Sequence, residues 1–390
     1  MNIVFINYSL YGGCSGVHIH FLANALQDRG HRCFVALPVE EDDPYYFGTP
    51  RYTFLSVDDA IILLKGNAPL LKDAVFHAWT PREISRRLTT GLARLARRPY
   101  FVHLEDNEEY ILESLHHKPF AQLEQEAREG SLVCNDAFIH PLRYREFLGG
   151  AAGVTCIIKA LTRFVPEGVP TQVFWPSCEE AFFRIPFSHN KKVRQQLGLR
   201  DDETVLVYPG AVHAANAPII DELFRALPLL AEQGYPVRLV RCGFDKDELL
   251  SPEALEARSR WGIQAGHVAA KELPHLIGAA DILVQPGMPG PFDDCRFPSK
   301  LTFFLASGRP VITAPTNIGK LLRDGEHCLY LHDSSAGDIA AQIRRLMENR
   351  DLARRIGENG RAFARQHFSW ERAAAAVESF YLKWGFPHGK

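Results

Sequence analysis

Short apolar runs alternate with helical patterns along this chain, and the alternation constrains the fold more than any other feature. Residues 3–6 form an apolar run, a glycine-containing turn follows, and a helical pattern then leads through Gly30 to a second apolar run at 33–38. A strand, a turn, a helix and a second strand make a βαβ unit, which implies a parallel sheet. The alternation continues with predicted strands at 74–79, 99–104 and 154–158, the last of which we expect to end the first half. A predicted helix after residue 79 takes Thr80 as its N-cap.

A break separates this half from a second alternating half. Residues 165–190 contain four prolines and little helical pattern, so we place an interdomain linker there. Predicted strands then recur at 205–208, 237–241, 282–284 and 310–312. We therefore predict two doubly wound α/β domains. They span residues 1–175 and 176–367, and residues 368–390 carry a final amphipathic helix.

Composition excludes several classes of protein. The 44 Lys and Arg residues balance 46 Asp and Glu residues, which gives no long-range reason to bind nucleic acid. The eight cysteines are scattered and form no CxxC pair, so we expect neither a zinc site nor a disulfide framework. The N-terminus has no signal-peptide pattern, and no apolar run approaches the roughly 20 residues of a membrane helix. These features are typical of a cytoplasmic enzyme.

A glycine-rich turn lies between the first predicted strand and helix. Gly12, Gly13 and Gly16 stand where loop amides and a helix dipole meet an anion or a sugar hydroxyl. The turn is not a full GxGxxG motif, so a nicotinamide-binding fold and a purely structural turn both stay open.

The most informative segment is residues 283–301. It places a loop rich in proline and glycine after a strand and directly before a helix. Gly287 allows a ligand to approach the backbone, and Ser299 and Lys300 lie in the first helical turn. A cation at that position opposes the helix dipole, so Lys300 and nearby Arg296 are unfavourable there unless an anion such as a diphosphate binds. Basic residues that simply face water are the alternative.

These residues bring a family into view. The patterns at 280–286, 297–301 and 305–312 resemble the donor domain of retaining GT-B glycosyltransferases of family 4, the group 1 type. The glycine turn and the Phe368-Ser369-Trp370 sequence before the last helix resemble other parts of that family. The resemblance implies an α/β GT-B fold with two Rossmann-like domains facing a central cleft. It also implies a C-terminal helix that returns to the first domain, and no obligatory metal or cofactor.

The resemblance also implies roles for individual residues. The catalytic candidates are His103, which matches the family's sugar-site histidine, and Lys300 and Arg296 as partners of the diphosphate. Glu105 and Asp106 are candidates for binding acceptor hydroxyls, although His103 as a core histidine and a solvated acidic loop remain alternatives. The candidates on the donor and nucleotide side are Gly13, Gly16, His213, Asn216, Gln285, Gly287, Asp293 and Ser299.

Two departures from the family pattern stand out. The two motif glutamates are replaced by Cys295 and Phe303, and the second of these glutamates normally holds the nucleotide ribose. Asp293 and Asp294 are partial substitutes for the first glutamate. We expect either that Phe303→Glu tightens nucleotide binding or that Phe303 belongs to the core.

The expected activity is transfer of a sugar from a nucleotide-diphosphate donor to a glycan, lipid-linked or small-molecule acceptor, with retention of configuration. A nucleotide-sugar epimerase and a degenerate, non-catalytic sugar-nucleotide-binding protein are the alternatives. The predicted 81–98 helix carries six arginines opposite apolar residues, which allows peripheral contact with the inner membrane, although a solvated surface helix is the simpler explanation.

Overall fold

The computed structural model describes residues 1–9, 11–38, 47–66, 71, 73–212, 216–243 and 246–386, and it omits the side chain of Cys14. The chain forms two compact units. The first unit contains Met1–Pro176, Asp294–Phe297 and Ser369–Lys390, and the second contains Ser177–Asp293 and Pro298–Phe368.

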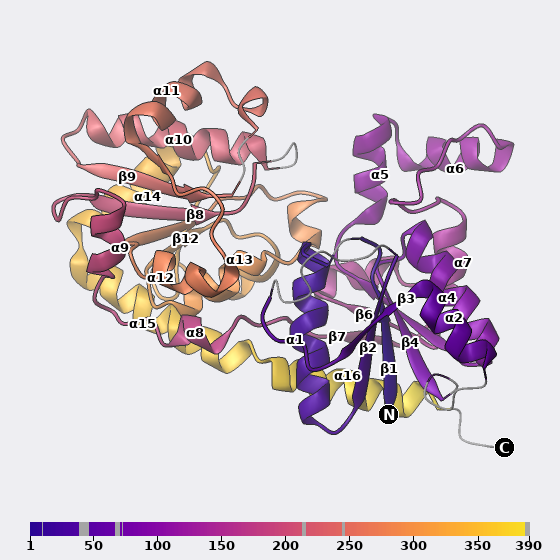
Figure 1. Cartoon of the computed structure of the whole chain (residues 1–390). Coiled ribbons are helices and arrows are strands. Elements are labelled where there is room, and N and C mark those ends of the chain that lie inside the picture. The colour runs from indigo at the N-terminus through magenta and orange to yellow at the C-terminus, as the bar shows by residue number, and fades with distance from the viewer. Residues whose placement is uncertain are drawn as a thin grey trace. The chain divides into compact units, whose positions relative to one another are not determined.

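The first unit is built on a parallel seven-stranded sheet (Figure 1). Its strands lie in the order β3-β2-β1-β4-β5-β6-β7, so the direction of the winding changes between β1 and β4. The strands are β1 (Asn2–Ile6), β2 (Arg32–Leu37), β3 (Thr53–Ser56), β4 (Ala74–Trp79), β5 (Tyr100–Leu104), β6 (Gly153–Cys156) and β7 (Thr171–Val173). The helices are α1 (Cys14–Asp28), α2 (Val57–Lys65), α4 (Glu83–Ala96), α5 (Glu108–His116), α6 (Phe120–Glu129), α7 (Arg143–Gly149) and α16 (Trp370–Trp384).

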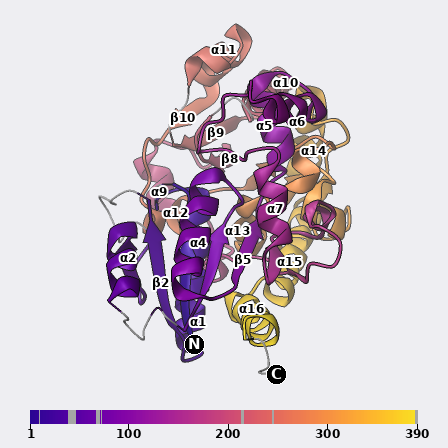
Figure 2. The ribbon, with the colours of Figure 1, turned by 90° about the vertical axis from the view of Figure 1, so that its right-hand side faces the viewer.

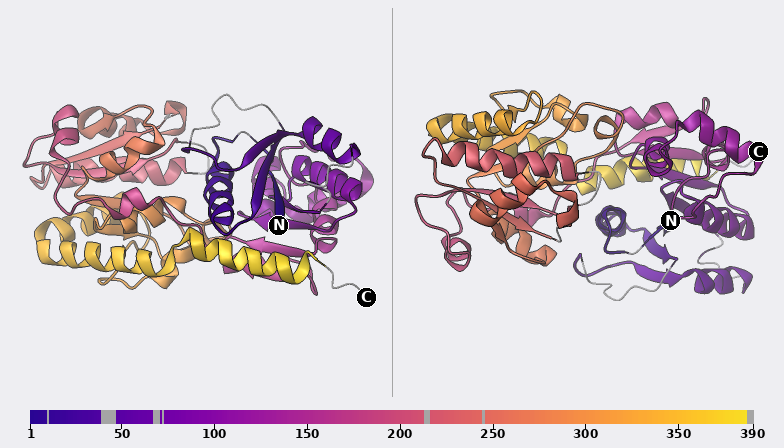
Figure 3. Two further views of the ribbon diagram at one scale, coloured as in Figure 1. Left: turned by 60° about the horizontal axis from the view of Figure 1, so that its bottom comes forward. Right: turned by 90° about the horizontal axis from the view of Figure 1, so that it is seen from above.

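Helices cover both faces of this sheet because its strands are apolar on both sides. Alternate residues of β1 and β2 pack on one face with α1 and α16, and the intervening residues pack on the other face with α2 and α4. Figure 2 shows α2 and α4 on their common face, and Figure 3 shows α16 alongside the sheet. This is the doubly wound arrangement expected of near-continuous apolar strands.

The second unit is built on a parallel six-stranded sheet in the order β10-β9-β8-β11-β12-β13. Here the winding changes direction between β8 and β11. The strands are β8 (Thr204–Pro209), β9 (Val237–Cys242), β10 (Gly262–Gln264), β11 (Ile282–Gln285), β12 (Val311–Thr313) and β13 (Leu329–Tyr330). The helices are α8 (Glu180–Phe183), α9 (Lys191–Gln196), α10 (Ala217–Ala231), α11 (Pro252–Trp261), α12 (Leu273–Ile277), α13 (Ser299–Ala306), α14 (Ala336–Glu348) and α15 (Arg350–His367).

Two local predictions from the sequence are wrong. The predicted N-cap Thr80 has a φ of 74°, and its amide bonds the carbonyl of His103 at 3.1 Å, so α4 begins only at Glu83 after Arg82. The predicted strand at 154–158, observed as β6, is not the last strand of the first sheet. It pairs with β7, which lies inside the segment predicted to be the linker. A three-residue strand between prolines leaves no apolar pattern to detect.

Within the described part of the chain, no helix is long and apolar enough to cross a membrane.

Candidate active site

The switch point of the first sheet gathers buried polar side chains around Glu105. Ser15 donates to Glu105 Oε2, while His18 Nδ1 and Trp79 Nε1 each lie 2.7 Å from Glu105 Oε1. Burial alone would raise the pKa of Glu105, but the hydrogen bond from His18, together with the nearby His18 and His103 rings and Ser15, lowers it to about 2. Glu105 is therefore an ionised carboxylate whose oxygens already have partners.

His103 lies next to this cluster, at the end of β5. Its ring contacts Trp79 in a tilted arrangement, at a centroid distance of 4.1 Å, and stacks on Phe174 at 5.1 Å. Nδ1 lies 2.7 Å from Thr155 Oγ1, and Nε2 is buried without a partner in the described part of the chain. Burial lowers the pKa of His103 to about 3, so the ring is neutral at physiological pH.

An acidic loop continues from Glu105. Arg82 Nε contacts both carboxylate oxygens of Glu108, at 3.0 and 3.1 Å. Burial and the charges of Glu108 and Glu105 raise the pKa of Asp106 to about 7, against the opposing effect of Arg82 and Arg296. Asp106 is half-buried, so its side chain is the member of this loop best placed to meet a hydroxyl.

The glycines of the first turn have structural reasons for being glycine. Gly13 is the N-cap residue of α1 and offers no side chain to the helix. A Cβ on Gly16 would overlap the carbonyl oxygen of Tyr11, so the chain at this point needs glycine. The contact with Tyr11 explains Gly16 without a ligand, and the predicted role of both glycines on the donor side stays a prediction.

In the second unit, hydrogen bonds from side chains to the backbone fix the loop after β11. Ser334 Oγ donates to the carbonyl of Gly287 at 2.7 Å, and Asp293 Oδ2 accepts from the amide of Met288 at 2.8 Å. The Nε2 of Gln285 donates to the carbonyl of Pro286 at 3.2 Å, while its buried Oε1 has no partner within the described part of the chain. The backbone of this loop is thus fixed by Ser334 and Asp293, and the buried amide oxygen of Gln285 stays without a partner among the described residues.

The charge comes from the first turn of α13. Lys300 Nζ lies 5.1 Å from the centroid of the Tyr208 ring, and its side chain runs along Gly210, which follows β8 with a φ of 111°. Among the described residues, no carboxylate pairs with this ammonium group. Ser299 is the first residue of the same helix. A cation beside the end of β8, in the first turn of α13, suits an anion that lies between the strand end and the N-terminus of the helix.

Other predicted donor-side residues lie elsewhere or have simpler roles. Asn216 Nδ2 donates to the carbonyl of Ala211 at 2.9 Å, which holds the loop before α10. His213 lies outside the described residues. Arg296 belongs to the first unit with Cys295, and Cys295 accepts from Arg163 at 3.1 Å.

Phe303 occupies the position of the second missing glutamate. Its ring stacks on Phe182 with a centroid distance of 4.8 Å and meets Phe304 edge-on at 5.1 Å. This packing favours the core interpretation over a ribose contact.

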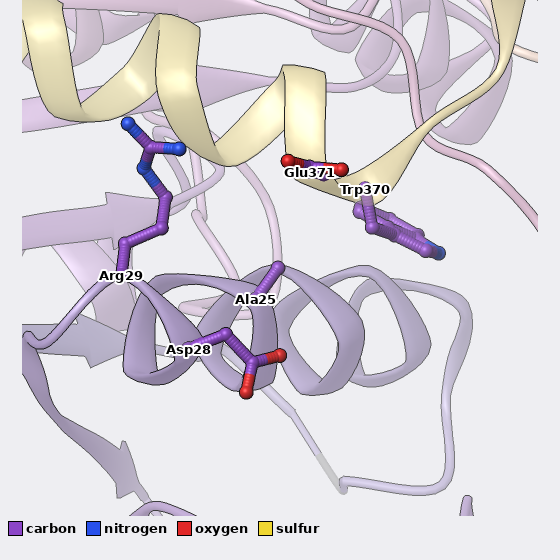
Figure 4. A pocket seen from close by; sticks show the side chains of 5 residues that line it. All are labelled: Ala25, Asp28, Arg29, Trp370 and Glu371. Carbon is purple, nitrogen blue, oxygen red and sulfur yellow. The ribbon is translucent and has the colours of Figure 1, made fainter.

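The arginines of α4 are largely matched by acids. Arg82 pairs with Glu108, Arg86 with Glu83 and Arg87 with Asp136. A surface hollow of about 530 Å³ lies between α1 and α16 (Figure 4). Ala25, Asp28, Arg29, Trp370 and Glu371 line it, and none of them is a candidate for the chemistry above.

Comparison with known proteins identifies this framework. Residues 203–349 match the family model described as Glycosyl transferases group 1. The matched residues, apart from Asp294–Phe297, lie in the second unit. The match covers β8 to α14 and includes Gly210, Gln285 and Lys300.

Curated relatives extend the similarity beyond this domain. The chain is 24% identical over 286 residues to spore coat protein SA of Bacillus subtilis (strain 168), covering 69% of this chain and 71% of that protein. It is 27% identical over 212 residues to D-inositol 3-phosphate glycosyltransferase of Streptomyces bingchenggensis (strain BCW-1), covering 51% of this chain but only 44% of that enzyme.

Solved structures confirm the fold. Anabaena HepE, crystallised with UDP and glucose, superposes with a TM-score of 0.69 at 18% identity, covering 97% of this chain and 99% of that one. The predicted α/β GT-B fold with two Rossmann-like sheets is confirmed, as is the resemblance to group 1 glycosyl transferases.

Sequence reasoning missed several residues of the first unit's site. Ser15, His18 and Trp79 bond Glu105, and Thr155 bonds His103, yet they come from three elements far apart in the chain, α1, β4 and β6. For Ser15, His18 and Trp79 the available signal was their position, at the carboxyl end of a predicted strand or at the start of a helix that follows one. Thr155 had no such signal.

Proposed function

We propose that this protein is a cytoplasmic retaining glycosyltransferase of family 4, which moves a sugar from a nucleotide-diphosphate donor to a glycan, lipid-linked or small-molecule acceptor. The observation that carries the proposal is the Lys300 ammonium beside Gly210, which has no carboxylate partner among the described residues, in the segment that matches the group 1 glycosyl transferase model. In the proposal, Lys300 and the amides at the start of α13 stabilise the negative charge of the leaving diphosphate.

The loop after β11 has the properties of a sugar-side wall. A Cβ on Gly287 would lie 3.4 Å from Asp293 Oδ2 and from Thr316 Oγ1, so polar oxygens surround this glycine. The buried Oε1 of Gln285, which has no partner within the described part of the chain, adds a hydrogen-bond acceptor. A set of acceptor oxygens suits sugar hydroxyls, which donate as well as accept hydrogen bonds.

In the proposal, the loop that follows β5 binds the acceptor substrate. Glu105 already accepts from three side chains, so it suits a positioning role, while the half-buried Asp106 has the exposure to meet an acceptor hydroxyl. His103 offers its unpartnered Nε2 nearby. We propose no obligatory metal, and we expect chelation by EDTA to leave turnover unchanged.

The test is a panel of nucleotide sugars, starting with UDP-glucose because the HepE structure contains UDP and glucose. We expect one nucleoside diphosphate to raise the melting temperature and the matching nucleotide sugar to release it in an acceptor-dependent reaction. Proton NMR of the product gives the anomeric configuration. An isomeric nucleotide sugar formed without acceptor would show an epimerase, and binding without turnover would show a degenerate protein.

A lipid-linked acceptor requires contact with a membrane surface. The exposed Arg94 and Arg97 of the α4 region are the cations available for such contact, because the other arginines named above are paired. We expect co-sedimentation with anionic vesicles to be lost at high salt and weakened in an Arg94→Gln, Arg97→Gln variant. Equal binding to neutral vesicles would contradict this part of the proposal.

A further inference from the structure

A line of buried hydrogen bonds connects the C-terminal helix to His103. The Tyr381 hydroxyl of α16 lies 2.5 Å from His77 Nδ1, and His77 Nε2 lies 3.0 Å from Thr155 Oγ1. The same Thr155 oxygen lies 2.7 Å from His103 Nδ1. The four side chains come from α16, β4, β6 and β5, and all four residues have no exposed surface.

The proton positions in this line follow from counting donors, beginning with Tyr381. Burial raises the pKa of Tyr381 well above its usual value, so the phenol keeps its proton. In the described part of the chain, the partner of this hydroxyl is His77 Nδ1. If the phenol did not donate to this nitrogen, a buried hydroxyl proton would lose its hydrogen bond, which is unfavourable. His77 Nδ1 is therefore the acceptor, and the neutral His77 ring carries its proton on Nε2.

The Thr155 hydroxyl accepts a hydrogen bond from His77 and donates one to His103. His77 Nε2–H donates to Thr155 Oγ1, and the hydroxyl has one proton of its own to donate. Within the described part of the chain, its hydrogen-bond partners are the two imidazole nitrogens, and His77 Nε2 is already a donor. The Thr155 proton must then go to His103 Nδ1. Because His103 is neutral, its own proton lies on Nε2.

We propose that Tyr381, His77 and Thr155 act as positioning residues that fix His103 as the Nε2–H tautomer, so that it donates a hydrogen bond to an oxygen of the substrate. The buried Nε2 without a protein partner is the atom that the line of bonds makes a donor. The ring is in contact with Trp79 and Phe174, and its Nδ1 is engaged by Thr155, which together favour the orientation that leaves Nε2 for a ligand. The ligand atom is consequently an acceptor, a sugar hydroxyl or a phosphate oxygen. This contact rests on the proposed function, and so does the direction of the line. The Nε2 proton of His103 gains its partner from the substrate, whereas the reversed line would leave the Tyr381 hydroxyl proton unpaired even with substrate bound.

The decisive experiment is long-range proton–nitrogen NMR of the full chain with labelled histidine rings at neutral pH. A His103→Asn variant assigns the His103 signals. We expect a protonated Nε2 and an unprotonated Nδ1 for His103 and also for His77. A wild-type His103 protonated on Nδ1 would overturn the proposal, whether or not the protein transfers sugar.

Two variants that nearly preserve volume test the cause. Tyr381→Phe removes the hydroxyl that sets the direction, and Thr155→Val removes the hydroxyl that transmits it. We expect both to give a mixture of His103 tautomers, while Thr155→Ser keeps the wild-type state. If Thr155→Val fails to fold, Tyr381→Phe still decides. An unchanged tautomer in a folded Tyr381→Phe protein would show that the line of bonds does not set it.

Kinetics with the nucleotide sugar selected by the panel test the substrate contact. We expect Tyr381→Phe to lower kcat about tenfold, the effect of one weakened hydrogen bond, with KM for the donor unchanged. Thr155→Ser should restore wild-type turnover relative to Thr155→Val. Altered tautomers with unaltered kcat would overturn the donor role of Nε2 while leaving the proposed transfer intact. Absence of transfer by the wild type would instead contradict the proposed function.

Discussion

The carboxyl edges of the two sheets differ in the groups that form them. In the first unit, the edge is a network of buried side chains, in which Ser15, His18 and Trp79 each bond Glu105. In the second unit, the edge is mainly backbone, with Gly210 and Gly243 at φ values of 111° and 109° and a loop tied by Ser334 and Asp293.

This difference indicates different tasks. Buried charged groups keep their geometry only when every partner is present, so the first edge suits groups that must be held in fixed positions for chemistry. An edge of glycines and amides lets a ligand approach closely, and Lys300 supplies positive charge beside Gly210, which suits an anion that enters and leaves.

The largest effect we expect is on the first edge. Glu105→Ala removes the acceptor of three buried donors and leaves His18 without its carboxylate, so the free energy of unfolding should fall by about 3–5 kcal/mol. Denaturant unfolding measures this. Glu167→Ala, an exposed glutamate of the same unit, is the matched control and should have little effect. A loss for Glu105→Ala as small as the control's would mean that the network does not hold the edge.

On the second edge the largest effect should concern a ligand rather than folding. Lys300→Ala should weaken binding of a nucleoside diphosphate by about 1.5–3 kcal/mol, roughly tenfold to a hundredfold, as expected for a charge-assisted contact. The melting temperature should change little. Lys192→Ala removes the same charge from an exposed site of the same unit and should leave the affinity unchanged in calorimetry.

The backbone of the second edge can be tested at Gly243. A Cβ there would lie 2.8 Å from the carbonyl carbon of Gly210 and 2.9 Å from the amide nitrogen of Ala211, in a conformation that L residues rarely adopt. Gly243→Ala should destabilise the protein by about 1–3 kcal/mol. Gly337→Ala, where a Cβ meets nothing within 4 Å, should not. Equal melting temperatures for the two variants would refute the close approach.

The smallest effect is a pH dependence at Asp106. Its pKa is raised from 3.8 to about 7, so the folded protein binds this proton more tightly than the unfolded chain does. Stability from this group is therefore lost as pH rises from about 4 to about 7. Solvent reaches the side chain, so we expect a loss of about 1 kcal/mol or less. Asp106→Asn should lose less stability than the wild type over this interval, and parallel curves would contradict the assignment.

Much of the framework was predictable because strand and helix patterns are local. The ranges 74–79, 299–306 and 370–384 coincide with β4, α13 and α16. The strand β7 escaped detection because three residues between prolines carry no periodicity.

The site was predictable only in part. Lys300 could be singled out because its helix position is electrostatically unfavourable without an anion. The partners of Glu105 and His103 could not, because side chains from separate strands meet only after the sheet is wound. Phe303 shows the same limit: its place in a family motif suggested a ribose contact, and only its stacking on Phe182 reveals the packing role.

One paired measurement tests the division of tasks most directly: UDP affinity by calorimetry and turnover of the matching nucleotide sugar, for His103→Ala and Lys300→Ala. Should the panel select another base, its diphosphate replaces UDP. The account predicts that His103→Ala binds the diphosphate like the wild type yet loses most turnover, whereas Lys300→Ala loses affinity. If His103→Ala remains folded and loses diphosphate affinity as strongly as Lys300→Ala does, the two edges do not divide the work and the account is wrong.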